Sequence, residues 1–442
     1  MGLSLNGKVR FITLGCKVNQ YETQAMREAV EGAGAVCAER ADQDVDFVVI
    51  NTCTVTGEAD RENHYWIRRA RRDHPQARIV VTGCMVTRDR AQLEALPEVD
   101  LVLSNQQKTD LVPRLLQSCG APAAQDLPEE SRESRRRYAP LAISASVGHS
   151  RAFVKIQDGC NHACSFCKVV LARGRSRSRE LADILEEVTR LRDSGYREIV
   201  FAGIQLGAYG LDFPQNRAGL EEVLEACSKI EGIDRLRLSS IEPTDVKPSL
   251  LSALRDIPKC VPHLHIPLQS GDDEILAKMN RRYGRAFYVD LIARLRGRLA
   301  DFSLTLDVMA GFPGEEETHF QNTLDLLETV KPLKCHVFPY SRREGTRAAG
   351  FEDVVESMMR ERIERLNRAG ERLGREARLP YAGRVMPVLV EHARKNNPLL
   401  QGVTANYLKV CFQGTRDWTG RIVPVKLLAL QGDLFLGKAH TS

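Results

Sequence analysis

Short apolar runs alternate with longer amphipathic stretches through the first 118 residues of the chain. Three of these runs, at residues 9–14, 47–50 and 78–81, have the length and β-branched composition of buried strands. Amphipathic segments of helical length lie between them. Because strands that alternate with helices form parallel sheets, we expect residues 1–118 to fold as an open parallel α/β domain.

The same alternation becomes more regular from about residue 149 to residue 375. Apolar residues between Leu181 and Leu191 recur at helical spacing, and Ser194-Gly195 provides a stop. A further helix from about Glu352 to Arg375 leads out of this region. The candidate strands are residues 152–156, 199–201, 236–238, 264–266, 304–308 and 336–338. Six such βα units predict an incomplete TIM-like (β/α)6 barrel, with its chemistry at the carboxyl ends of the strands.

Two segments differ from this α/β pattern. Residues 119–148 combine proline, alanine and an arginine run without apolar periodicity, and are expected to be a linker. Residues 376–442 are rich in short strands punctuated by glycine, at 385–390, 407–412, 423–430 and 434–438. We expect them to form a small antiparallel β-barrel of the size of an oligonucleotide-binding module.

Composition indicates a compartment and a class of partner. The chain of 442 residues contains twelve cysteines, has no secretory signal layout and no apolar stretch of membrane-spanning length. We therefore expect a cytoplasmic protein with reduced thiols and no membrane partner. The net charge is only +5, but arginines gather at residues 68–72, 132–137 and 173–179. Guanidinium groups pair with phosphates, so these clusters suit an RNA partner; solvated helix faces and a disordered linker are the alternative.

Three cysteines, Cys160, Cys164 and Cys167, stand in the spacing C-x3-C-x2-C. Four cysteines normally hold a [4Fe–4S] cluster, so three would leave one iron open to a ligand. The alternative is zinc, which closes its shell with four protein ligands. His162 is the nearby fourth donor, but it lies inside a cramped loop. The ligand count therefore favours an iron–sulfur cluster.

A second set of three cysteines is dispersed along the N-terminal section. Cys16, Cys53 and Cys84 each follow the carboxyl end of a candidate strand. In an open parallel sheet those ends share one rim, where ligands bind. We expect the three thiols to converge there, although a single cysteine is more often a small buried hydrophobe.

These motifs together resemble those of the methylthiotransferases, radical S-adenosylmethionine (SAM) enzymes that insert sulfur and a methyl group into an unactivated C–H bond. The resemblance covers nearly the whole chain and includes the TRAM domain, an RNA-binding module, at the carboxyl end. The segment Cys16-Lys17-Val18-Asn19 resembles the branch that acts on N6-threonylcarbamoyladenosine in tRNA. The chain departs from the family pattern at Lys168, where an apolar residue is usual, and at Val170, where proline is usual. The matching segments are residues 13–23, 51–56, 81–84, 158–167, 173–174, 207–210, 267–271, 311–315, 336–341 and 406–407.

The resemblance implies two [4Fe–4S] clusters and SAM as cofactors. Cys160, Cys164 and Cys167 would hold the cluster that cleaves SAM, and Cys16, Cys53 and Cys84 an auxiliary cluster that carries the sulfur. The expected partners are tRNA and an electron donor of the flavodoxin or ferredoxin type, with the sulfur source unknown. The implied product is the 2-methylthio derivative of the adenosine 3′ of the anticodon.

Candidate SAM contacts occupy the expected mouth of the barrel, although a polar residue at a strand end can equally cap the next helix. They are Phe166, at the adenine, and Gly203, Ser239, Glu242 and Gln269. Arg173 is a candidate to orient a carboxylate or phosphate, with a surface ion pair as the alternative. Tyr407 could stack on RNA or belong to the core of its domain.

Two other functions fit parts of this pattern. The first is a methylthiotransferase acting on another tRNA adenosine or on a ribosomal protein, against which the residues after Cys16 argue. The second is a non-catalytic iron–sulfur RNA-binding protein, against which the complete cysteine triplet argues.

Overall fold

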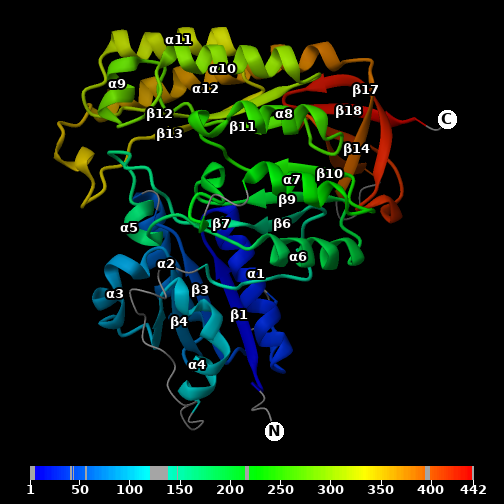
Figure 1. Cartoon of the computed structure of the whole chain (residues 1–442). Coiled ribbons are helices and arrows are strands. Elements are labelled where there is room, and N and C mark those ends of the chain that lie inside the picture. Colours follow the sequence, from blue (N-terminus) through cyan, green and yellow to red (C-terminus); the bar gives the residue numbers. More distant parts are fainter. Residues whose placement is uncertain are drawn as a thin grey trace.

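Three sheet systems follow one another along the chain (Figure 1). The computed structural model describes residues 5–39, 42, 44–54, 57–119, 138–146, 148–214, 219–393 and 399–440. The N-terminal α/β domain lies against the central barrel, and the C-terminal β-barrel lies at one end of that barrel (Figure 1). No helix within these described ranges is both long and apolar enough to cross a membrane.

The N-terminal domain contains a parallel five-stranded sheet with the order β2-β1-β3-β4-β5. Its strands are β1 (Lys8–Thr13), β2 (Val36–Cys37), β3 (Phe47–Thr52), β4 (Arg78–Gly83) and β5 (Leu101–Leu103). Its helices are α1 (Lys17–Gly32), α2 (Gly57–Asp73), α3 (Val86–Glu94) and α4 (Leu111–Ser118), with a 3-10 turn, η1 (Gln106–Asp110), before α4. Strand β3 is buried at every position, as expected for a central strand of a doubly covered parallel sheet. The predicted open parallel α/β fold is confirmed.

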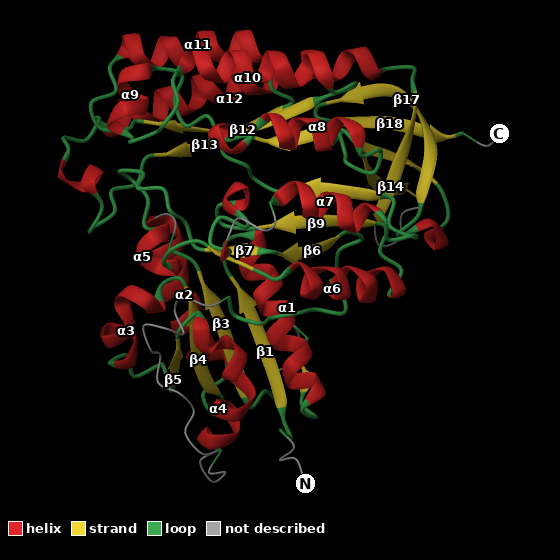
Figure 2. Cartoon of the chain, in the orientation of Figure 1, coloured by secondary structure: helices red, strands yellow, loops and turns green. Residues whose placement is uncertain are grey.

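The strand order places a switch in direction between β1 and β3, because the chain moves outward to β2 and then returns. Open α/β sheets bind ligands at such a point, beyond the carboxyl ends of the strands. Those ends face the central barrel (Figure 2). Cys16 follows β1 and Cys53 follows β3, so both cysteines stand at this switch point.

The central region forms the predicted six-stranded (β/α)6 barrel. Two parallel three-stranded ladders, β6-β9-β10 and β11-β12-β13, are joined by isolated bridges from Leu236 to Cys260 and from Ser240 to His265. The strands are β6 (Ala152–Lys155), β9 (Glu198–Ala202), β10 (Arg235–Leu238), β11 (His263–His265), β12 (Ser303–Ala310) and β13 (Lys334–Pro339). A small hairpin of β7 (Gln157–Asp158) and β8 (Arg177–Ser178) flanks the cysteine triplet.

Helices surround the barrel strands. They are α5 (Val169–Arg173), α6 (Leu181–Asp193), α7 (Leu220–Ser228), α8 (Pro248–Asp256), α9 (Asp273–Lys278), α10 (Arg285–Arg298), α11 (Glu317–Val330) and α12 (Glu356–Arg378). Short 3-10 turns are η3 (Leu206–Ala208), η5 (Pro243–Asp245), η6 (Arg347–Gly350) and η7 (Leu379–Tyr381). In α6, Ile184, Val188 and Leu191 are fully buried, as their helical spacing predicts.

The C-terminal barrel is closed by five strands in the order β14-β15-β16-β18-β17. They are β14 (Val385–Ala393), β15 (Leu399–Thr404), β16 (Lys409–Gln413), β17 (Ile422–Gln431) and β18 (Leu434–Ala439), with η8 (Arg416–Trp418) between β16 and β17. The predicted small barrel is confirmed, with one parallel pair, β16 and β18, in an otherwise antiparallel closure. Two details differ from the prediction. Strand β15 was not expected, and Tyr407 lies in a turn with φ of 71° rather than in a strand.

The domains contact one another through buried polar groups. The Arg235 guanidinium, at the start of β10, donates to the carbonyls of Val403 (3.1 Å) and Pro387 (2.8 Å) of the C-terminal barrel. On the other side, the Tyr21 hydroxyl of α1 donates to the Leu141 carbonyl at 2.7 Å. Leu141 lies in the second half of the expected linker, where residues 138–146 pack into the core shared by α1 and the central barrel.

Candidate cluster and cofactor site

The cysteine triplet lies in a loop between the β7 strand and helix α5. Backbone amides point at two of its sulfurs: His162 N donates to Cys160 Sγ (3.3 Å) and Val169 N to Cys167 Sγ (3.4 Å). Burial raises the pKa of Cys160 to about 11 and that of Cys167 to about 12, and the nearby Cys164 thiol adds to both shifts. The three sulfurs therefore lie close enough to act on one another's pKa, and N–H groups directed at sulfur suit thiolates that ligate iron.

Arg281 connects this loop to a predicted cofactor residue. Its Nη1 donates to Cys164 Sγ at 3.2 Å, and its Nη2 donates to the Glu242 carboxylate. Burial raises the pKa of Glu242, while the positive charge of Arg281 opposes that rise. Sequence reasoning missed Arg281, because an Arg-Arg-Tyr-Gly segment carries no motif that separates it from a surface turn.

The segment after β9 contacts the first cysteine of the triplet. The Gln205 Oε1 accepts from the Asn161 backbone N at 2.9 Å and lies 3.4 Å from Cys160 Sγ. Gln157 Oε1 in turn accepts from the backbone N of Gln205 at 2.8 Å. A Cβ at Gly203 would lie 2.9 Å from that same Gln157 oxygen. Glycine is therefore needed here for packing of the strand end, independently of any cofactor contact.

The remaining predicted SAM contacts, Phe166, Ser239 and Gln269, are connected less directly to the cysteine triplet. Phe166 packs edge-to-face on Phe312, with ring centroids 6.4 Å apart. Ser239 is buried just after β10, and Gln269 takes a left-handed backbone with φ of 67° beside β12. In the hydrogen bonds recorded for the described residues, the Ser239 and Gln269 side chains do not reach the triplet. Their role in binding SAM stays a prediction.

The second cysteine set gathers at the rim of the N-terminal sheet. Cys16 is exposed at the start of α1, whereas Cys53 and Cys84 are buried. A Cβ at Gly15 would lie 2.6 Å from Cys53 Sγ, so the chain before Cys16 passes directly against Cys53. Burial raises the pKa of Cys84, and the Cys16 thiol adds to the rise, which places Cys16 near Cys84. The donor set fits three irons of a cluster.

Neither cysteine set is already arranged around a single point. Within the described residues, no group of three or more His, Cys, Asp or Glu side chains has the arrangement that would hold a metal ion. Neighbouring segments bring the thiols of each set near one another, and the role of these thiols as ligands stays a prediction.

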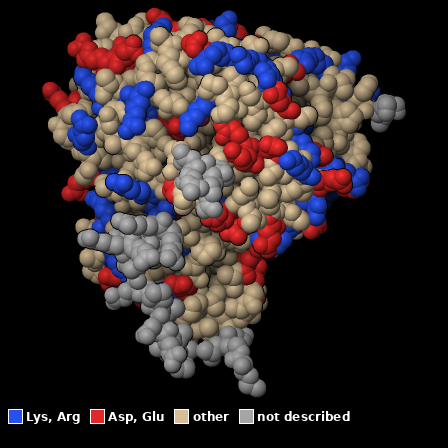
Figure 3. All heavy atoms as spheres, viewed as in Figure 1, with Lys and Arg blue, Asp and Glu red and all other residues tan. Residues whose placement is uncertain are grey.

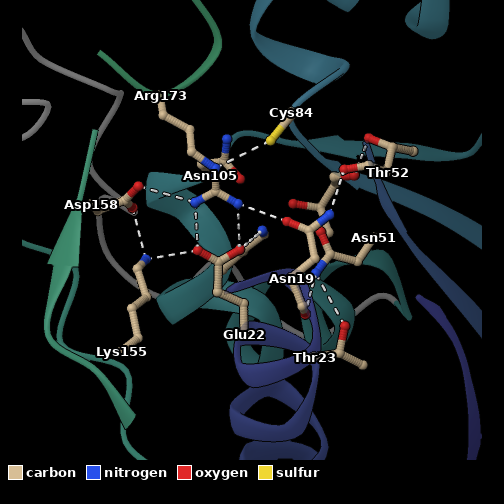
Figure 4. A network of polar contacts seen from close by, with 12 residues as sticks. Asn19, Glu22, Thr23, Asn51, Thr52, Cys84, Asn105, Lys155, Asp158 and Arg173 are labelled. Atoms are coloured by element: carbon tan, nitrogen blue, oxygen red, sulfur yellow. Dashed lines mark hydrogen bonds and ion pairs between the residues drawn. The ribbon is translucent and has the colours of Figure 1, made fainter. Parts of the chain in front are cut away.

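Arg173 links the two sets through a buried polar network (Figure 4). Its Nε donates to Cys84 Sγ (3.2 Å), and its Nη2 donates to the Asn19 side-chain oxygen (2.7 Å). Its Nη1 donates to Glu22 (2.8 Å) and to Asp158 (3.1 Å). Arg173 ends α5, which begins two residues after Cys167. The Arg173 side chain therefore connects helix α5, which follows the cysteine triplet, to Cys84 of the N-terminal domain.

Glu22 is the common acceptor in this network. Lys155 donates to it at 2.7 Å, and Lys108 donates to its second oxygen. Burial acts to raise the pKa of Glu22, but the charges of Arg173, Lys108 and Lys155 outweigh burial and hold it well below its usual range. The pKa of Asp158 is likewise lowered by Lys155 and Arg173 against the effect of burial. Both carboxyl groups of the network are therefore ionised at neutral pH.

The structure tests part of the arginine prediction. In the third cluster, Arg173, Arg177 and Arg179 are buried in ion pairs with Glu22, Asp158 and Glu187, so these three are not available to phosphates, whereas Arg175 is exposed. In the first, Arg69 and Arg71 pair with Asp73 and Asp100. The second, at residues 132–137, lies outside the described residues. Basic and acidic residues are interspersed on the face in Figure 3.

Tyr407 faces the central barrel. Its ring stacks on His263 with centroids 4.3 Å apart and an interplanar angle of 14°. The ring also packs against the hydrophobic core of the C-terminal barrel, which agrees with the core alternative and adds a contact between two domains. Stacking of Tyr407 on RNA stays a prediction.

The sequence matches two family models and many characterised relatives. The Radical SAM superfamily model matches residues 154–327, and the Uncharacterized protein family UPF0004 model matches residues 8–104. A threonylcarbamoyladenosine tRNA methylthiotransferase MtaB from Bacillus subtilis is 40% identical over 428 residues, covering 95% of this chain and 93% of the relative. A protein of the same name from Thermotoga maritima is 35% identical, with 96% and 95% coverage. A tRNA-2-methylthio-N(6)-dimethylallyladenosine synthase from Desulforamulus reducens is 32% identical, with 98% and 96% coverage.

Solved structures support the fold. The radical SAM methyltransferase TsrM from Kitasatospora setae matches with a TM-score of 0.57 at 15% identity, covering 78% of this chain and 77% of that one. The superfamily match implies SAM and one [4Fe–4S] cluster as cofactors. With relatives this similar over nearly the full length, the chain belongs to the radical SAM methylthiotransferases and is a transferase.

Proposed function

We propose that the protein is a tRNA methylthiotransferase that converts N6-threonylcarbamoyladenosine, 3′ of the anticodon, to its 2-methylthio derivative. The main support is the similarity to MtaB enzymes along nearly the whole chain. The contact from Arg173 to Cys84 adds a structural argument, because it brings the two three-cysteine sets to one interface between domains. A reaction that combines radical generation with sulfur delivery needs both sets within reach of one substrate.

In this proposal Cys160, Cys164 and Cys167 would hold the cluster that binds SAM, and Cys16, Cys53 and Cys84 an auxiliary cluster. Together these groups supply the radical, the sulfur and the methyl group, which no side chain can provide at an inert C–H bond. Each set offers three thiols, which would leave one iron of a four-iron cluster open to a ligand. Zinc, which prefers four protein ligands, fits this donor set poorly.

The protein's own residues hold and orient these groups. Arg281 fixes Cys164 and the Glu242 carboxylate relative to each other. Gln205 ties the strand end of β9 to the loop at Cys160 and Asn161. Arg173 holds Cys84 while its remaining donors are satisfied by Asn19 and Glu22. Each of these residues acts through a cysteine and is a positioning residue.

The first test measures iron and acid-labile sulfide per chain after anaerobic reconstitution. We expect about eight irons in the wild type and about four in a Cys16→Ala, Cys53→Ala, Cys84→Ala variant, at four irons per cluster. The matched control is Cys37→Ala, which removes a thiol from the same domain at β2 and should leave the iron count unchanged. About four irons in both proteins would remove the auxiliary cluster from the proposal.

The second test identifies the product. The reconstituted enzyme, SAM and dithionite are incubated with tRNA that carries either N6-threonylcarbamoyladenosine or dimethylallyladenosine. The nucleosides of the digested tRNA are then identified by mass spectrometry. We expect 2-methylthio-N6-threonylcarbamoyladenosine. The competing candidate is the dimethylallyl substrate, because relatives at 32–34% identity carry that name. Its exclusive methylthiolation would refute the proposed substrate.

A further inference from the structure

A cluster of cationic and aromatic side chains lies where α1, the central barrel and the C-terminal barrel meet. The guanidinium carbons of Arg237 and Arg151 lie 5.1 Å and 5.6 Å from the centre of the Tyr407 ring, which stacks on His263. Lys17, the residue after Cys16, extends its ammonium over Phe153 at 5.9 Å. The positive charge of Lys17 lowers the pKa of both Tyr407 and His263. The five charged and aromatic groups therefore form one cluster of neighbours.

Two buried side-chain nitrogens in this cluster have no hydrogen-bond partner. Arg237 donates through Nε to Glu198 (2.6 Å) and through Nη2 to the Ala405 carbonyl (3.0 Å). Its Nη1 is buried without a partner, in a residue that is only 2% exposed. The Nδ1 of His263 is buried and unpartnered as well. Within the described part of the chain, Lys17 makes no recorded ion pair and remains accessible to solvent. Buried donors are normally satisfied, so the Nη1 of Arg237 can donate to a further acceptor.

The charge balance indicates which acceptor fits. Lys17, Arg151, Arg235 and Arg237 carry four positive charges, and the acids that pair with them are Glu198 and Glu391. Two positive charges remain in excess. Although burial raises the pKa of Tyr407, the charges of Arg151, Lys17 and Arg237 outweigh it and lower that pKa. The excess positive charge of this cluster therefore favours binding of an anion.

The backbone at Tyr407 is also held in an uncommon conformation. Its φ of 71° lies in the left-handed region, which is unfavourable for a residue with a side chain. Such strain is retained where the surroundings require it, and it concentrates at binding sites. Here it keeps the aromatic ring between the two arginines and His263.

We propose that Lys17 and Arg237 bind the carboxylate of the threonylcarbamoyl group and so determine specificity for that substrate. The inference rests on the proposed function. The two candidate substrates named by the relatives differ at this group, since the threonylcarbamoyl substituent carries a carboxylate and the dimethylallyl substituent is a hydrocarbon. A site with buried unpaired donors rejects a hydrocarbon, because its polar groups would lose water and gain no partner. Lys17 lies one residue from the proposed auxiliary ligand Cys16, so recognition and sulfur delivery would share one edge of the same base.

The test compares binding of fluorescent anticodon stem–loops to the full reconstituted chain, without turnover. The stem–loops carry unmodified adenosine, N6-threonylcarbamoyladenosine, its carboxylate methyl ester, or dimethylallyladenosine. Lys17→Met is the main variant, because Lys17 has no recorded partner whose loss would unfold the protein. Lys17→Arg keeps the charge, and Lys229→Met removes an exposed charge elsewhere, directly after helix α7.

We expect the wild type to bind the threonylcarbamoyl stem–loop at least tenfold more tightly than its methyl ester, as one charge-assisted hydrogen bond allows. Lys17→Met should reduce this ratio to about two without changing the affinity for unmodified RNA, whereas Lys17→Arg and Lys229→Met should retain it. An unchanged ester ratio in Lys17→Met would overturn the carboxylate site. An equal loss for every stem–loop would overturn it too, by showing a general phosphate contact. Tightest binding of the dimethylallyl stem–loop by the wild type would instead refute the proposed function.

Discussion

The substitution Glu22→Gln tests how far the buried network holds the N-terminal domain on the barrel. Glu22 is 1% exposed and accepts hydrogen bonds from Arg173 of α5, Lys155 of β6 and Lys108 of η1. Glutamine has nearly the same volume, so the change creates no cavity. It leaves three buried cations with Asp158 as the remaining acid of the cluster.

Removing one partner of a buried ion pair costs about 3–5 kcal/mol, because the opposite charge stays buried without compensation. We expect the free energy of unfolding of the N-terminal domain to fall by that amount. The chain has two tryptophans, Trp66 on α2 and Trp418 in the C-terminal barrel. In a Trp418→Phe background, the fluorescence of Trp66 therefore follows unfolding of the N-terminal domain alone during a urea titration.

The matched control is Glu186→Gln, which breaks an exposed pair with Arg190 on α6. Exposed pairs contribute about 0–1 kcal/mol. The pH dependence gives a second measurement. Because the pKa of Glu22 is lowered on folding, its contribution is complete above the unfolded value of about 4.3 and disappears as pH falls through the folded pKa. The wild type should lose more stability on acidification below about pH 4.3 than Glu22→Gln does. A difference between Glu22→Gln and its control of less than 1 kcal/mol would refute the reasoning.

Two further predictions concern the cysteine triplet. Replacing Arg281 by methionine removes a charged donor to Cys164 and Glu242. Hydrogen bonds to charged groups contribute about 1.5–3 kcal/mol, so we expect the affinity for SAM, measured by equilibrium dialysis, to be at least tenfold weaker. The control is Arg282→Met, at the exposed neighbouring position. In the metal-free reduced protein at pH 8, burial raises the pKa of Cys160 to about 11, so its thiolate fraction is on the order of 100-fold below that of an unperturbed thiol of pKa about 8.5. Mass spectrometry should show correspondingly slower alkylation than at the exposed Cys119, with the rate rising toward pH 11; equal rates would contradict the buried loop.

The alternation of apolar runs was sufficient to predict the two α/β regions and the small barrel. Strands β6 and β9 carry a clear local signal, because a buried parallel strand favours apolar residues at consecutive positions. Strands β10 and β11 alternate leucine with arginine or histidine and carry a weaker one. Strand β15 escaped prediction because Gln401 and Gly402 interrupt its apolar run. The β5 strand has only three residues, which is too short for a pattern to be distinctive.

The candidate cysteines could be selected from the sequence, because thiol spacing and strand ends are local features, and their role as ligands stays a prediction. The arginines could not. Arg173, Arg281 and Arg362 are buried, yet an arginine in sequence is most simply interpreted as a surface residue. Their acid partners, Glu22, Glu242 and Glu315, come from distant elements. Only the packed structure brings these charges together, and with them the contacts that orient the thiols.

The length of helix α5 sets the distance between the Cys167 loop and the Arg173 side chain. One end is fixed by Cys167, whose sulfur accepts from Val169 N, and the other by Arg173, whose guanidinium reaches Cys84 in another domain. An α-helix advances about 1.5 Å and turns about 100° for each added residue. Inserting one residue between these anchors would swing the guanidinium away from the sulfur, although every residue named in the network would still be present. The number of residues in this segment is therefore as much a part of the site as their identity, and length variation here should be tolerated far less than substitution at its exposed positions, such as Leu171.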